Sequence, residues 1–148
     1  MKYITTAIFL VVTLGCFNSC KKDNTENTAG NLATTGAWEL ESVSGDMPTK
    51  NYLPGNGNIF EFTDSTYKKY TNGILSKSGH YSITPDATVV ETVGLVIPAG
   101  QFTHRIIFDN DTSAAKTFID VLNKKLRFVA GFFPVDGGSL SVYGKKIN

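Results

Sequence analysis

Short stretches of alternating apolar and polar residues fill the sequence from residue 36 onward, and this pattern limits the fold more than any other feature. Trp38 and Leu40 alternate with Glu39 and Glu41, so one face of this segment is apolar and the other carries carboxylates. Similar stretches recur at intervals of roughly ten residues and are separated by turn residues. Since none of them keeps a helical apolar period over about ten residues, the pattern predicts an all-β domain.

The individual strands are predicted from this alternation and from short β-branched runs. They fall at residues 38–43, 60–62, 66–70, 74–83, 87–93, 94–97, 103–108, 117–122, 125–129 and 140–145. The residue pairs 72–73 and 123–124 predict hairpins, Gly79 predicts a bend or a bulge, and residues 112–115 are expected to form a single helical turn. About eight such strands form either a small up-and-down antiparallel β-barrel or a β-sandwich, and the local pattern leaves both open.

An export signal is predicted at the start of the chain. Lys2 precedes a segment, residues 4–14, that is apolar except for three threonines. A membrane-spanning helix needs about 20 apolar residues. Because this segment is shorter, we interpret it as the h-region of a secretory signal. Both cysteines of the chain, Cys16 and Cys20, lie where the apolar segment gives way to a polar one.

The two cysteines fit a lipidation site better than a metal site or a disulfide. A zinc site needs more ligands than this pair offers, and a disulfide would persist only if the leader were retained. The run Ser-Cys-Lys-Lys-Asp at 19–23 resembles the lipobox junction of bacterial lipoproteins, especially those of Bacteroidetes-type Gram-negative envelopes. The resemblance implies that residues 1–19 are a lipoprotein signal peptide and that Cys20 carries diacylglycerol, with acyl chains such as palmitate. Cys16 is a second candidate for lipidation.

A polar tether is predicted between the lipidated cysteine and the folded domain. In residues 20–35, Leu32 is the only large apolar side chain, which is too little apolar surface to offset the entropy lost on ordering. Fully extended, such a segment reaches ~50 Å. We therefore expect a domain that is anchored through Cys20 to the outer membrane, on its periplasmic face or on the cell surface, and held clear of the lipid.

Several motifs downstream of the tether resemble lipocalin-like domains. Residues 35–40, Thr-Gly-Ala-Trp-Glu-Leu, are similar to the G-x-W opening of these domains. Further motifs that resemble small lipocalin-like lipoproteins of Bacteroidetes-type bacteria lie at 60–67, 79–83 and 142–146. The resemblance implies a small up-and-down barrel over residues 36–148, in which Trp38 packs at the closed end. Typical lipocalins pack an arginine over this tryptophan, and the candidates here are Arg105 and Arg127.

Enzymatic activity is not predicted, and no cofactor or metal is expected. No nucleophile, zinc-binding or phosphate-loop motif occurs in the sequence. Of the two histidines, His80 is predicted to face outward, whereas His104 shares a strand face with Ile106 and Phe108 and is expected to point inward as a core residue. The charges are nearly balanced, with 14 basic and 13 acidic side chains, so the basic stripe that nucleic-acid binding requires is not indicated.

The aromatic residues point to two hypotheses for a non-enzymatic, monomeric lipoprotein. Phe132 and Phe133 are predicted in a loop, as a lid, a partner contact or a plug on the core. In the first hypothesis the barrel holds a small apolar or amphipathic ligand under this lid, with His104, Phe108 and Tyr81 as further lining residues. In the second, the barrel is filled and the domain is a structural or protein-interaction module of the envelope. An enclosed apolar cavity favours the first hypothesis and a filled interior the second.

Overall fold

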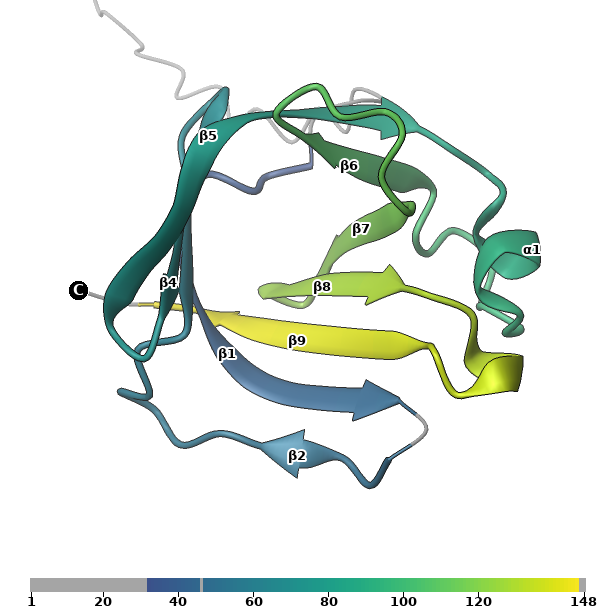
Figure 1. The fold of residues 1–148 in the computed structure, drawn as a ribbon, viewed down its shortest axis with the longest axis horizontal. Coiled ribbons are helices and arrows are strands. Elements are labelled where there is room, and N and C mark those ends of the chain that lie inside the picture. The colour runs from purple at the N-terminus through teal and green to yellow at the C-terminus, as the bar shows by residue number, and fades with distance from the viewer. Residues whose placement is uncertain (1–31, 46, 147–148) are drawn as a thin grey trace, which may run out of the picture.

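The alternating strands close into a ring in the structure. The computed structural model describes residues 32–45 and 47–146. Within them, eight consecutive antiparallel strands lie side by side, and the last returns to pair with the first (Figure 1). These strands are β1 (Gly36–Gly45), β3 (Ile59–Phe62), β4 (Thr66–Thr71), β5 (Ile74–Pro85), β6 (His104–Phe108), β7 (Thr117–Leu122), β8 (Lys125–Ala130) and β9 (Ser139–Lys145). The predicted up-and-down barrel is therefore confirmed over the alternative sandwich, and a short extra strand, β2 (Lys50–Asn51), pairs with the second half of β1.

The two predicted hairpins are confirmed. Asn72 and Gly73 join β4 to β5 with φ values of 50° and 80°, and Asn123 and Lys124 join β7 to β8 with values of 52° and 61°. Positive φ at both central residues is the geometry of the two-residue turn that matches the twist of the flanking strands. Asparagine and glycine tolerate this region best, which explains Asn72, Gly73 and Asn123, whereas Lys124 adopts positive φ without this advantage.

Gly79 lies in a continuous strand, and the irregularity of β5 falls elsewhere. The pairing of β4 with β5 shifts register where Lys69 faces Lys77 and Tyr70 faces Leu75, which leaves Ser76 as the extra residue. At Gly79, an added Cβ would lie 1.8 Å from Oδ1 of Asp109. Glycine is needed here because the Asp109 side chain occupies the space. Of the two predicted alternatives, a bend or a bulge, the bulge is therefore wrong at this position.

A short helix replaces the strand predicted at 87–93, and the strand predicted at 94–97 is an irregular segment. Helix α1 (Val89–Val93) is capped by Gly94, which has a φ of 72°. The N–H of Gly94 donates a hydrogen bond to the carbonyl of Val90. Val89 and Val93 are one helical turn apart and both are buried. Because the helix has only five residues, it is too short to leave a periodic signal, and β-branched composition favoured strands. Within the described chain, no helix has the length and apolar content needed to cross a bilayer.

The single helical turn expected at 112–115 is also absent from the described structure. Asp111 instead organises this loop, since its Oδ1 accepts hydrogen bonds from the backbone N–H groups of Ser113 at 3.0 Å and Ala114 at 3.1 Å. The Ser113 hydroxyl donates to the same oxygen at 2.6 Å. An aspartate that satisfies nearby backbone donors offers an alternative to helix formation, which explains the difference.

The inner core fills the barrel interior with side chains from all eight barrel strands. Phe60 of β3 lies at its centre, with its ring centroid 5.5 Å from those of Phe128 and Tyr143 and 6.1 Å from that of Phe108. These partners belong to β8, β9 and β6, so the contacts cross the interior rather than run along the sheet. Burial of this kind raises the pKa of Tyr143 to about 12.

A second, outer core lies on the opposite face of β7 and β8. Phe118 and Ile119 are consecutive in β7 and both are fully buried, but Ile119 belongs to the inner core and Phe118 to the outer one. The other buried members of the outer core are Val89, Val93, Phe102 and Val129. The connection from β5 to β6, which contains α1, therefore folds over the outside of the barrel.

Candidate functional site

The end of the barrel where β1 begins is closed by the residues that precede this strand. Trp38 is 1 % exposed, and its indole N–H donates a hydrogen bond to the carbonyl of Thr34. Thr34 is itself buried, and Leu32 packs against the inner core. Packing thus begins before the boundary predicted at residue 36, because Thr34 is hydrogen-bonded to the tryptophan and Leu32 packs against the inner core.

A lysine, and not an arginine, packs over Trp38. The Nζ atom of Lys145 lies 4.8 Å from the centroid of the Trp38 ring and donates to the carbonyl of Thr35 at 2.8 Å. Arg105 and Arg127 alternate with inward-facing neighbours, so both lie on the outer face of the barrel. The prediction of an arginine partner is therefore wrong.

Tyr81 and Phe108 are packed in the inner core. The Tyr81 ring meets Phe62 edge to face at 4.9 Å, and its hydroxyl donates to the carbonyl of Thr63 at 2.7 Å. The Phe108 ring lies 4.6 Å from that of Tyr67. Both side chains thus have aromatic or backbone partners, and Phe108 also lines a small pocket beneath the β6–β7 loop.

The two histidines are separate from this cluster. His80 is exposed, as predicted. His104 is half-buried, lies opposite Ile119 of the inner core in the register of β6 and β7, and places Nδ1 3.0 Å from the hydroxyl of Thr103. In the part of the chain that the structure describes, no three His, Asp or Glu side chains are grouped closely enough to hold a metal ion.

Phe132 and Phe133 lie outside the barrel. Phe133 begins the 3-10 helix η1 (Phe133–Val135) and packs against the outer core. Phe132 stays partly exposed, and its ring would lie 2.7 Å from a Cβ added at Gly94, which places it against the end of α1. This segment is a plug on the outer core and does not cover the interior, because Phe133 packs against the outer core and Phe132 lies against Gly94.

An apolar surface is exposed where α1 and η1 meet. We call it the α1–η1 surface, and it consists of Val90, Leu95, Val96, Phe132 and Val135. Val96 is 95 % exposed and Val135 is 72 % exposed. Figure 1 shows α1 beside the coil that precedes β9, on the opposite side of the molecule from the C-terminal end of the barrel. Exposed apolar side chains that gather in one region are typical of interaction sites.

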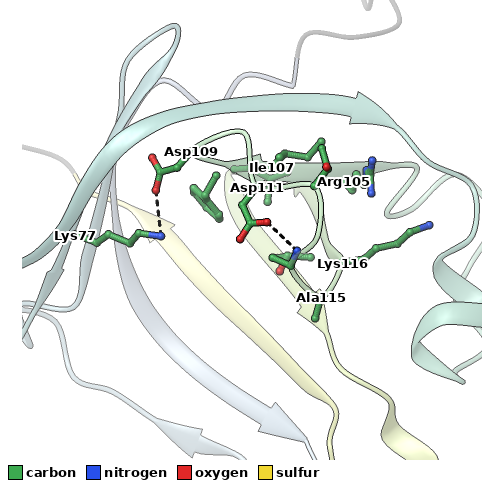
Figure 2. Close-up of a pocket in the computed structure, with 12 residues that line it drawn as sticks. Lys77, Arg105, Ile107, Asp109, Asp111, Ala115 and Lys116 are labelled. Carbon is green, nitrogen blue, oxygen red and sulfur yellow. Dashed lines mark hydrogen bonds and ion pairs between the residues drawn. The ribbon is translucent and has the colours of Figure 1, made fainter.

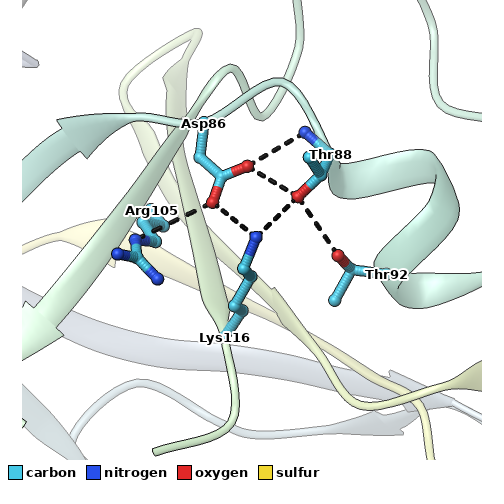
Figure 3. A network of polar contacts seen from close by, with 5 residues as sticks. All are labelled: Asp86, Thr88, Thr92, Arg105 and Lys116. Atoms are coloured by element: carbon cyan, nitrogen blue, oxygen red, sulfur yellow. Dashed lines mark hydrogen bonds and ion pairs between the residues drawn. The ribbon is translucent and has the colours of Figure 1, made fainter. Parts of the chain in front are cut away.

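We call α1, η1 and the residues around them the α1–η1 lobe. Asp86 attaches this lobe to the barrel (Figure 3). Its side chain is 10 % exposed, and its Oδ1 accepts hydrogen bonds from the backbone N–H and the hydroxyl of Thr88 at 3.0 and 2.6 Å. Oδ2 lies 2.9 Å from Nζ of Lys116 and 3.7 Å from Nε of Arg105. Burial of the carboxylate opposes ionisation, but the hydrogen bonds from Thr88 and Lys116 outweigh it and lower the pKa of Asp86 to about 2.

A small pocket of about 260 Å³ lies beneath the loop between β6 and β7 (Figure 2). Ile106 and Phe108 contribute its apolar lining. At one side, Lys77 Nζ lies 3.1 Å from Oδ2 of Asp109, and the Tyr67 hydroxyl donates to the same oxygen at 3.0 Å. The hydrogen bond from Lys77 lowers the pKa of Asp109, whereas burial, followed by the bond to Asp109, raises the pKa of Tyr67.

Sequence reasoning missed the residues that organise these regions. Asp86 follows a proline and precedes Thr88 by two positions, a local pattern typical of an aspartate that caps a turn, so a signal was present. Lys116 and Lys145 carried no such signal, because only the closed barrel brings them to Asp86 and Trp38. The predicted lipidation site, Cys20, lies outside the described residues.

Comparisons with known proteins add no relatives. No protein-family model, no curated protein and no solved structure matches this chain.

Proposed function

We propose that this protein is a lipid-anchored lipoprotein of the cell envelope whose lipocalin-like barrel is a non-enzymatic module that binds another envelope protein. The observation that carries the proposal is the α1–η1 surface, five apolar side chains exposed on a lobe built outside a filled barrel. Its members come from two segments that are far apart in the sequence and meet only in the fold. Burial of these apolar side chains against a partner protein is more favourable than their exposure to water.

The envelope assignment is supported by the sequence and fits the architecture. The apolar leader, the lipobox-like run around Cys20 and the polar tether favour acylation and attachment to the outer membrane. The closed up-and-down barrel with Trp38 buried in its first strand is consistent with the lipocalin-like resemblance. The aromatic packing around Phe60 favours protein interaction over an enclosed ligand.

Site-specific photo-crosslinking in intact envelopes tests the proposal. A photoreactive residue at Val96 is expected to give a discrete adduct with one partner, and V135D in the same chain is expected to abolish it. The matched control places the photoreactive residue at Leu53, which is 83 % exposed on a different loop. The absence of an adduct at Val96, or the same adduct from Leu53, contradicts binding through the α1–η1 surface.

The pocket of Figure 2 supports a second candidate, the binding of a small amphipathic molecule. Its apolar lining and the Lys77–Asp109 pair would contact the two parts of such a ligand. A115W is expected to fill the pocket and to reduce the uptake of a fluorescent amphipathic probe, while A99W, at an exposed position outside the pocket, leaves uptake unchanged. Equal uptake in the two variants excludes this pocket as the binding site.

A further inference from the structure

Four lysines gather at one end of the barrel. This basic end consists of Lys124, Lys125, Lys145 and Lys146. They line two shallow depressions that share Glu41, Gly144 and Lys145, so they form one continuous surface. The β7–β8 hairpin and the end of β9 supply them, because Lys125 and Gly144 are paired across these strands.

The carboxylates nearby leave this surface with an excess of positive charge. Glu41 forms an ion pair with Lys125. Glu39 is engaged by the loop before β3, since its carboxylate accepts hydrogen bonds from the N–H groups of Gly55 at 3.0 Å and Gly57 at 3.2 Å. Among residues 32–45 and 47–146, no carboxylate forms an ion pair with Lys124 or with Lys146.

The chain also enters the barrel at the basic end. Lys145 donates to the carbonyl of Thr35 at 2.8 Å, and the N–H of Lys146 donates to that of Ala37 at 2.9 Å. Residues 35–37, through which the chain enters β1, therefore lie beside Lys145 and Lys146. Further upstream, the sequence contains Lys21 and Lys22, directly after Cys20.

From this charge and this point of entry, we infer that the basic end docks on anionic phospholipid headgroups of the membrane that holds the anchor. Lysines close to an anionic surface are attracted to it over about a Debye length. Leu122, exposed beside the β7–β8 turn, adds an apolar contact. A tether keeps the local lipid concentration high, so a weak contact is enough to orient the domain.

Docking in this orientation directs the α1–η1 surface away from the membrane. Figure 1 places α1 opposite the C-terminal end of β9, which belongs to the basic end. The charged residues on the α1–η1 lobe that remain exposed, Glu91 and Asp136, are acidic, so this side has no attraction for an anionic surface. The inference rests on the proposed lipid anchor for its setting but concerns a different face of the protein.

Vesicle co-sedimentation of residues 21–148 tests the inference. This segment lacks the acylated cysteine but holds the closed barrel and both cores, which lie within the described residues, and it therefore contains every contact that the fold uses. Binding to vesicles that contain phosphatidylglycerol is expected to exceed binding to pure phosphatidylcholine vesicles and to weaken as salt is added. K124Q combined with K146Q is expected to lower the affinity on the order of tenfold.

The matched control removes the same charge elsewhere. K50Q combined with K68Q, two exposed lysines outside the basic end, is expected to change the affinity less than about twofold. Equal binding to both vesicle types, or an equal loss in both double variants, overturns the inference. The intact mass of the full chain extracted from envelopes reports acylation of Cys20 separately. An unacylated chain therefore overturns the anchor alone, and an acylated chain whose domain ignores phosphatidylglycerol overturns the docking alone.

Discussion

The inner and outer cores share two strands but are held together in different ways. The inner core draws side chains from all eight barrel strands, so the ring contacts of Phe60 with Phe108, Phe128 and Tyr143, which come from strands that do not pair with β3, depend on closure of the barrel. The outer core is covered by the β5–β6 connection and by η1, and Asp86 holds this connection through contacts with three residues, Thr88, Arg105 and Lys116. One sheet therefore carries two cores, an interior built by all its strands on one face and, on the other face, a core covered by a connection that Asp86 holds in place.

Loss of a central ring is expected to produce the largest effect. F60A removes a side chain that contacts five other rings in the filled interior, and it should lower the free energy of unfolding by about 3–5 kcal/mol. Urea denaturation of residues 21–148, followed by the fluorescence of the single tryptophan, measures this. F132A, on the exposed lobe, serves as the control and should cost far less. Equal losses would contradict the separation of the two cores.

Removal of the charge at Asp86 is expected to loosen the outer lobe. D86N should lower the free energy of unfolding by about 2 kcal/mol at neutral pH, because the pKa of Asp86 lies at about 2, below its usual 3.8. Since the folded pKa is the lower one, this stabilisation is present above about pH 4 and is lost as the pH falls toward 2. Hydrogen exchange should show faster opening of α1 than of β7.

The exposed Asp136, next to η1, gives a matched control for this change. D136N removes one carboxylate from the same lobe without breaking an ion pair, since Asp136 forms none with the residues that the structure describes. Its stability should follow that of the parent chain at every pH. If D86N and the parent differ as much at pH 2 as at pH 7, the role assigned to Asp86 is wrong.

Two glycines of the β5–β6 connection separate a steric effect from a backbone effect. Gly94 and Gly100 have φ values of 72° and 82°, so alanine costs about 1 kcal/mol at either site. At Gly94 the added Cβ would also lie 2.6 Å from Cδ of Pro134, whereas at Gly100 nothing lies within 4 Å. G94A should therefore destabilise more than G100A in thermal unfolding. Equal losses of stability in G94A and G100A would show that Gly94 is not in close contact with Pro134.

The smallest effect is expected on the α1–η1 surface itself. V96S replaces a side chain that is 95 % exposed and should change the free energy of unfolding by less than about 0.5 kcal/mol. The same denaturation assay measures this, and partner crosslinking of the same variant reports on binding. A large loss of stability would place Val96 in the outer core and would remove it from the proposed binding surface.

The sequence predicted features that depend on local chemistry and missed those that depend on closure. The turns at 72–73 and 123–124 were placed correctly, because Asn72, Gly73 and Asn123 accept positive φ, and Lys124 adopts it in the second turn. Helix α1 was missed, since the burial of Val89 and Val93 comes from their contact with Phe118 in a distant strand.

The candidate site shows the same limit. Phe132 and Phe133 were recognised as lying outside the strands, but their direction depends on contacts with Gly94 and Gly138 that no local pattern reveals. Lys145 covers Trp38 only because the last strand returns to the first. Alternation along a strand assigns residues to its two faces. It does not show which outer face is covered by another segment, as the outer faces of β7 and β8 are by the β5–β6 connection.

The pairing of β9 with β1 places the two ends of the folded unit next to each other. Trp38 lies opposite Lys145 in the register, and Ala37 accepts a hydrogen bond from Lys146. A short linker could therefore join these ends, and new termini could be opened in the Asn72-Gly73 turn without losing any strand pair. All strand pairs of the barrel are kept when the termini are moved to this turn. The barrel is therefore a suitable scaffold for circular permutation.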